Sequence, residues 1–129
     1  MSEYQALYDE GEAVTLIAGS GGVVGGAGVL ADGTMAGDAA VGAAGIAKID
    51  AASGQPFGIY RDGIHRTTAS GAIAVKDPLC FAAAATVGGV TVGRVRKWVA
   101  GTDAVAARIG TAWSAAADGQ SVTYALFGV

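Results

Sequence analysis

The sequence predicts an all-β fold, a small barrel or sandwich with glycine- and alanine-rich loops and at most one short helix. Two observations point to this class. Short apolar runs rich in β-branched residues recur along the chain, and turns rich in glycine separate them. The length of 129 residues fits one domain. We therefore expect an N-terminal arm over residues 1–12 and a single β domain over residues 13–129.

The element boundaries follow from the same runs. An alanine- and glycine-rich stretch, residues 34–45, is expected to be loop with short strand pieces. Residues 79–85 follow Asp77 and Pro78, which could cap a short helix, and an edge strand is the competing interpretation. The expected strands are residues 13–18, 46–50, 57–60, 64–68, 72–76, 90–99, 106–113 and 121–127.

An internal repeat is visible in the glycines. Gly54 and Gly119 are each followed by glutamine, then by apolar residues at alternate positions, then by Gly63 and Gly128 nine positions on. This pattern indicates a turn that needs glycine, followed by a strand with one buried face. Upstream of these Gly-Gln pairs, residues 43–46 resemble residues 106–109. The second segment is followed by two more residues before its Gly-Gln pair than the first. We therefore expect residues 43–64 and 106–129 to form two similar strand–turn–strand units.

Composition narrows the possible functions. Only 15% of the residues are charged, and 22 are glycine. So much uncharged small-residue surface favours self-association or docking onto a larger assembly. A net charge of −3 argues against a nucleic-acid partner. No apolar run is long enough for a membrane span, and the acidic start does not resemble a secretion signal.

Few residues offer catalytic chemistry. The single histidine, His65, lacks a second histidine or a suitably spaced carboxylate pair, so a structural role on a half-exposed strand is expected. Cys80 lies in an apolar segment that would raise its pKa, so it is interpreted as a small core residue. The glycine loop at residues 19–25 lacks the third glycine of a dinucleotide-binding fingerprint. The sequence therefore predicts no enzyme, no cofactor and no metal.

Two segments are candidates for docking. The acidic arm carries three apolar or aromatic side chains, Tyr4, Leu7 and Tyr8. The densest basic cluster is Arg94, Arg96 and Lys97, in which the two arginines should share one strand face and Lys97 should lie on the other. A patch for an acidic neighbour and a merely solvated strand face both remain open. Two tryptophans, Trp98 and Trp113, are assigned to the core by default, with a subunit interface as the alternative.

The order of several motifs resembles that of the decoration, or cement, proteins that coat tailed-phage heads. The resemblance begins with a glycine–acid pair, a valine-rich strand and a Gly-Gly-Val turn. It continues through an alanine/glycine stretch, a strand ending in a glycine–apolar pair and an acid–proline–apolar step, and closes on an Ile-Gly-x-Ala strand, an alanine-rich turn and an apolar strand. The matching segments are residues 11–12, 14–18, 21–23, 34–45, 63–64, 77–79, 109–112, 115–119 and 122–127.

The resemblance implies a β fold, often trimeric, that binds the outside of a capsid and reinforces it by bridging subunits of the major capsid protein. It implies a virion location, after synthesis in the host cytoplasm, and it carries over no catalytic residues. The segment around Arg94–Lys97 is more basic than the resemblance implies. Two alternatives remain open at this point: a trimeric fibre or adhesin module that binds a receptor or glycan, and a small enzyme with a glycine-rich ligand loop.

Overall fold

The computed structural model describes residues 14–126, which are built almost entirely of strands and turns. The predicted all-β class is confirmed. Within the described residues the one helical segment is a single 3-10 turn, η1 (Val105–Ala107). The strands are β1 (Val14–Ile17), β2 (Gly28–Leu30), β3 (Ala43–Ala47), β4 (Pro56–Tyr60), β5 (Gly63–Ala69), β6 (Pro78–Val87), β7 (Val90–Lys97), β8 (Gly110–Ala112) and β9 (Ser121–Leu126).

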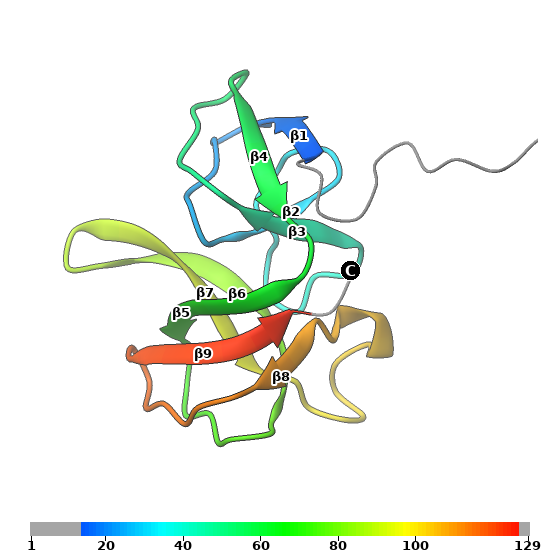
Figure 1. Cartoon of the computed structure of the whole chain (residues 1–129), viewed down its shortest axis with the longest axis vertical. Coiled ribbons are helices and arrows are strands. Elements are labelled where there is room, and N and C mark those ends of the chain that lie inside the picture. The colour runs from blue at the N-terminus through cyan, green and yellow to red at the C-terminus, as the bar shows by residue number, and fades with distance from the viewer. Residues whose placement is uncertain (1–13, 127–129) are drawn as a thin grey trace, which may run out of the picture.

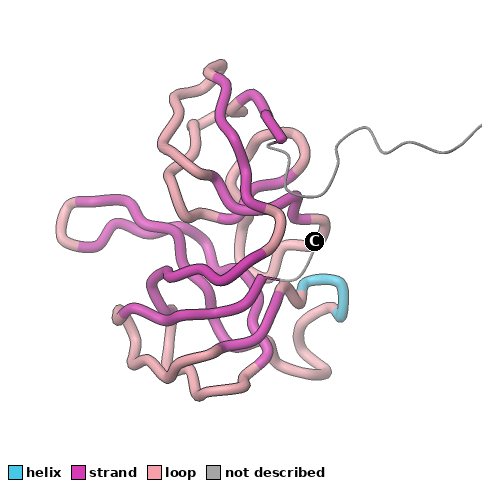
Figure 2. The backbone as a smooth tube through the Cα atoms, viewed as in Figure 1, coloured by secondary structure: helices cyan, strands magenta, loops and turns pink. Residues whose placement is uncertain are grey.

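The strands form two sheets that follow one another along the chain (Figure 1). The first unit, residues 14–60, is an open four-stranded sheet in the order β1-β4-β3-β2. The second unit, residues 63–126, is a closed barrel in the order β5-β7-β6-β8-β9. Loops and turns make up most of the rest of the chain (Figure 2).

The two units share one pairing scheme. In the first unit Val14 pairs with Ile59, and in the second unit His65 pairs with Tyr124. Val14 thus corresponds to His65, and Ile59 corresponds to Tyr124. When β1 is shifted from residue 14 to 65 and β4 from residue 59 to 124, every β1–β4 pair coincides with a β5–β9 pair. The turns repeat as well, because Gly54 and Gly119 each donate a backbone hydrogen bond of 2.8 Å, to the carbonyls of Ala18 and Ala69 respectively. The chain therefore contains one strand arrangement twice.

The predicted repeat is confirmed, with a correction to its upstream part. The β3–β4 pair Ile46↔Tyr60 corresponds to the β8–β9 pair Thr111↔Ala125, so one shift of 65 residues applies from β3 to the end of β4. The expected match of residues 43–46 to residues 106–109 is wrong by two residues. Alanines and glycines recur so often here that composition alone did not fix the register. Gly128 lies outside the described residues.

One insertion, within the second unit, distinguishes it from the first. The connection from residue 30 to 45 corresponds to that from residue 80 to 110, which is 15 residues longer. The longer connection holds the outer part of β6 and all of β7, a hairpin that projects from the body (Figures 1 and 2). The base of β7 pairs in parallel with β5, through Thr68↔Arg94 and Ala69↔Val95, and so closes the barrel. The insertion accounts for the difference between an open sheet and a barrel.

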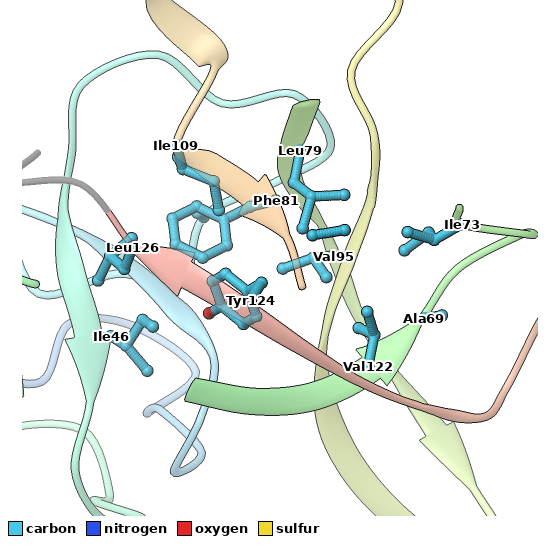
Figure 3. Packing of buried hydrophobic residues seen from close by; sticks show 12 residues of the cluster. Ile46, Ala69, Ile73, Leu79, Phe81, Val95, Ile109, Val122, Tyr124 and Leu126 are labelled. Atoms are coloured by element: carbon cyan, nitrogen blue, oxygen red, sulfur yellow. The ribbon is translucent and has the colours of Figure 1, made fainter. Parts of the chain in front are cut away.

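Each unit has its own hydrophobic core, and the cores correspond. The six buried residues of the first core are Ala18, Val23, Val29, Ala47, Phe57 and Ile59. According to the strand and turn pairings, their equivalents in the second unit are Ala69, Ile73, Leu79, Ala112, Val122 and Tyr124. All six equivalents are buried in the barrel core. Figure 3 shows Tyr124 inside this core, with Ile46 of the first unit beside Leu126. Ile46 thus joins the first unit to the barrel.

Several predicted boundaries need correction. Of the two interpretations left open for residues 79–85, the strand is confirmed and the helix is wrong. This segment lies in β6, paired with β7 and, at Pro78 and Leu79, with β8. Alanine favours helices, but pairing with two neighbouring strands overrides that weak preference. Of residues 72–76, only Ile73 pairs, as an isolated bridge to Ala116. The strand expected over residues 106–113 is shorter and follows η1, and the strand expected over 46–50 begins and ends earlier, as β3.

Candidate functional site

The basic cluster on β7 is organised around Arg96. Its guanidinium contacts Asp38 through Nε (2.7 Å) and Nη2 (3.2 Å), and Asp103 through Nη1 and Nη2 (both 2.8 Å). Nη1 also donates to the carbonyl of Lys97 at 2.9 Å. A planar guanidinium bonded by two carboxylates has its donors occupied. Arg96 therefore ties three segments together: β7, the loop before β3 and the loop after β7.

Electrostatics fit that role. The Arg96 guanidinium holds the pKa of Asp103 down at about 2, helped by the hydrogen bond from the backbone N–H of Val99. The hydrogen bonds that Arg96 donates to Asp103 and Asp38 raise the pKa of Arg96. The side chain of Asp103 is only 5% exposed and that of Asp38 is 60% exposed. One carboxylate is thus built into the fold, and the other meets Arg96 at the surface.

The other two basic residues lie nearby but are held differently. Arg94 donates from Nε to the carbonyl of Ala83 at 3.0 Å, across the base of the hairpin. Lys97 Nζ lies 3.8 Å from Asp77 and its side chain is about half exposed. The structure thus brings the three predicted basic residues onto one strand, where Arg96 is committed to internal pairs. The other predicted docking residues, Tyr4, Leu7 and Tyr8, lie outside the described residues.

Sequence reasoning missed the apolar surface of the barrel. Trp113, assigned by default to the core, is 59% exposed, so that assignment is wrong. The backbone N–H of Trp113 donates to the carbonyl of Thr123 on β9. Ala125, also on β9, pairs with Ile64 on β5, and Ile64 is 50% exposed. Because directly paired residues point to one side of a sheet, Ile64 and Ala125 share the outer face. The alternation in β9, with Val122 and Tyr124 buried, is the sequence signal that could have located this face.

A second uncharged surface lies at the hairpin. Val87 and Val90 are 47% and 62% exposed on either side of Gly88 and Gly89. Both glycines have positive φ, 59° and 83°, which suits the tight turn between paired strands. The hairpin thus presents β-branched side chains to solvent without an accompanying charge at its tip.

His65 has a structural setting at the junction of the units. Its Nε2 lies 2.7 Å from the carbonyl of Asp62, and its ring lies between Tyr60 (5.2 Å between centroids) and Tyr124 (6.1 Å). On the other side, Lys48 Nζ lies 4.8 Å from the centre of the Tyr60 ring, a cation–π distance. The half-buried histidine fills a gap between aromatic rings.

Other polar residues serve turns and the core. Cys80 is fully buried, and burial raises the pKa of its thiol to about 11, as expected for a core residue. Asp118 accepts a 2.7 Å hydrogen bond from the N–H of Gly71, and Asp32 accepts from the hydroxyl of Thr34 at 2.6 Å, which lowers the pKa of Asp32. In the part of the chain that the structure describes, histidine, cysteine and carboxylate side chains form no group of three that could hold a metal ion. No helix between residues 14 and 126 is long and apolar enough to cross a membrane.

An all-β chain with exposed apolar faces and internally paired charges has the features of a structural protein that works by surface contact. The comparisons make this specific, because the model of the phage cement protein family matches residues 8–127. The chain belongs to the phage cement protein family, and its role is structural and associated with the capsid. A search of curated proteins found no match.

Proposed function

We propose that this protein binds the outer surface of a phage capsid as a homotrimer and stabilises the shell by bridging neighbouring subunits of the major capsid protein. The observation that carries the proposal is the family match over residues 8–127 of a 129-residue chain. Synthesis in the host cytoplasm, before assembly on the head, belongs to the same proposal. The buried thiol of Cys80 supports it, because the fold needs no disulfide.

Docking is assigned mainly to apolar contact by the N-terminal arm, through Tyr4, Leu7 and Tyr8. Burying one large apolar side chain contributes roughly 1.5–3 kcal/mol, whereas an exposed ion pair contributes about 0–1 kcal/mol. Charge is a smaller term, carried by Arg94 and Lys97. Arg96 acts indirectly, because its two carboxylate partners already neutralise it.

The test is binding to purified heads that lack the protein. Wild-type protein is mixed with such heads, and bound copies per head are counted after sedimentation. We expect saturable binding and a higher temperature of head disruption. Deleting residues 2–10 should weaken binding strongly without unfolding the domain, because β1 begins only at residue 14.

The matched control keeps the arm and neutralises its charge. Replacing Glu3, Asp9 and Glu10 together by their amides should weaken binding only mildly, and raising the salt concentration should have little effect. Full binding by the truncated protein would refute docking by the arm. A collapse of binding at moderate salt would instead assign docking to Arg94 and Lys97 against an acidic capsid surface.

A further inference from the structure

Three aspartates of this chain stand directly before a glycine: Asp32, Asp62 and Asp118. In an Asp-Gly pair the main-chain nitrogen of the glycine can attack the carboxyl carbon of the aspartate, because glycine has no side chain to hinder the approach. The residue that follows is glycine in all three pairs, so their reactivities in an unfolded chain should be similar. The fold therefore decides which pair reacts.

The carboxyl group is held in place at two of the three pairs. Asp32 Oδ1 accepts hydrogen bonds from the hydroxyl of Thr34 at 2.6 Å and from its backbone N–H at 3.0 Å, which lower the pKa of Asp32. Asp118 Oδ1 accepts a 2.7 Å hydrogen bond from the N–H of Gly71, 47 residues away in the sequence. These bonds must break before either carboxyl carbon can turn towards the following nitrogen.

The third pair lies in the short link between the two units (Figure 1). β4 ends at Tyr60 and β5 begins at Gly63, so Asp62 stands between two strands, and both Asp62 and Gly63 are exposed. The main-chain carbonyl of Asp62 accepts a hydrogen bond from His65 Nε2 at 2.7 Å. Within residues 14–126, no hydrogen bond or ion pair holds its carboxyl group, which is therefore free to rotate.

We propose that Asp62 is a site of spontaneous isomerisation, at which aspartate becomes isoaspartate. The Gly63 nitrogen attacks Cγ of the protonated Asp62 carboxyl group. A bond forms between this nitrogen and Cγ, the carboxyl OH leaves with the N–H proton as water, and a five-membered succinimide ring remains. Water then opens the ring. Attack at Cγ restores aspartate, whereas attack at the main-chain carbonyl carbon breaks its bond to nitrogen and gives isoaspartate. The water lost is regained, and no oxidant or reductant takes part.

The product changes the link between the units. In isoaspartate the main chain runs through Cβ and Cγ, so the link gains one carbon atom. The former main-chain carbonyl becomes a carboxylate, which places a negative charge where His65 Nε2 now meets a neutral oxygen. Gly63 pairs with Leu126 at the start of β5, so the added atom falls where the chain enters the barrel. Isomerised copies should therefore unfold at a lower temperature than unmodified ones.

The test incubates the purified, folded, full-length protein in mildly acidic buffer made with heavy-oxygen water. Passage through the ring leaves a heavy oxygen in the residue, so mass spectrometry of the digested protein follows each pair separately. Chromatography of the same peptides separates isoaspartate from aspartate. Because a hydrogen bond to the carboxyl group must first break at Asp32 and Asp118, Asp62 should react about tenfold faster than either. In protein unfolded by urea, the three pairs should react at similar rates.

Two variants separate the effect of the hydrogen bonds from that of the sequence. Asp62→Glu keeps the charge but would need a six-membered ring, so labelling of this pair should fall to background. Thr34→Val removes the hydroxyl that holds Asp32 and keeps the shape of the side chain, so labelling of Asp32 should rise severalfold.

Three results would overturn the proposal: equal labelling of the three pairs in the folded protein, a faster reaction at Asp32 or Asp118, or an unreactive Asp62. Capsid binding enters none of these measurements, so their outcome is independent of the proposed function.

Discussion

The two units of this protein have the same strand register and yet differ in form. The first is an open sheet with six buried core residues, and the second closes into a barrel around the six counterparts. Closure adds further buried residues to the barrel core, including Phe81 and Val95 from the inserted hairpin. One insertion of 15 residues therefore changes both the topology and the size of the core without disturbing the shared pairs.

The comparison also shows which positions the shared arrangement requires. Gly45 and Gly110 are counterparts, and a Cβ on either would collide with a backbone carbonyl, that of Tyr60 or that of Ala125. Tyr60 and Ala125 are themselves counterparts. The same steric reason thus preserves glycine in both units, independently of the sheet around it.

The largest effect is expected when these glycines are replaced. Gly110→Ala should destabilise the protein by about 3 kcal/mol, because the added methyl group forces β8 away from β9 in a closed barrel. Gly45→Ala should cost less, since an open sheet can adjust. Urea unfolding measures both. The control is Gly37→Ala, where a Cβ meets nothing within 4 Å; equal stability of all three variants would show that the shared constraint is not real.

A smaller effect is expected where the units meet. Gly28 lies under the ring of Phe81, with a Cβ position 2.5 Å from the ring. Gly28→Ala should cost about 1–2 kcal/mol, because the ring must move off its site. In the Phe81→Leu background the same change should cost less, since the two sites are in contact. Additive losses, measured by urea unfolding, would mean that this contact does not join the units.

An acid titration sharpens the role of Arg96. The pKa of Asp103 falls from 3.8 to about 2 in the fold, so its contribution to stability is full above pH 4 and is lost as the pH falls towards 2. Arg96→Gln should remove most of that pH dependence and lower stability at pH 7. Thermal unfolding at several pH values measures both. A variant with the same acid loss as wild type would show that Arg96 does not stabilise the charged form of Asp103.

The smallest effect concerns the counterparts Ile59 and Tyr124. The Tyr124 hydroxyl is buried, which raises its pKa, and it has no hydrogen-bond partner among the described residues. Tyr124→Phe should therefore leave stability unchanged or raise it by about 1 kcal/mol, as measured by urea unfolding, because a buried unpaired hydroxyl is costly. A clear loss of stability would mean that the hydroxyl is satisfied after all.

The all-β class and the repeat were predictable because β-branched runs and Gly-Gln turns are local signals. The first half of the repeat escaped notice because so few identities mark it, such as Ala18 with Ala69 and Gly21 with Gly71. The sequence left helix and strand both open for residues 79–85, because pairing with other strands decides the conformation of this segment.

The candidate site was predictable only in part. The basic cluster was found as a sequence pattern, but the partners of Arg96 lie 58 and 7 residues away, and nothing local identifies Asp38. The exposure of Trp113 depends on where β8 ends against β9, a tertiary feature that residue type alone does not reveal. The sequence shows which side chains are charged or apolar, but it does not show which residues they contact in the fold.

The single buried cysteine has a further consequence. Cys80 is fully buried in β6, with its pKa raised to about 11, so at neutral pH it is a protonated thiol that reagents in solution do not reach. A change from reducing to oxidising surroundings therefore leaves the folded barrel covalently unaltered and free of cross-links between copies. The rate at which a thiol reagent labels Cys80 would instead report how often β6 separates from its neighbouring strands, and so how often the barrel opens.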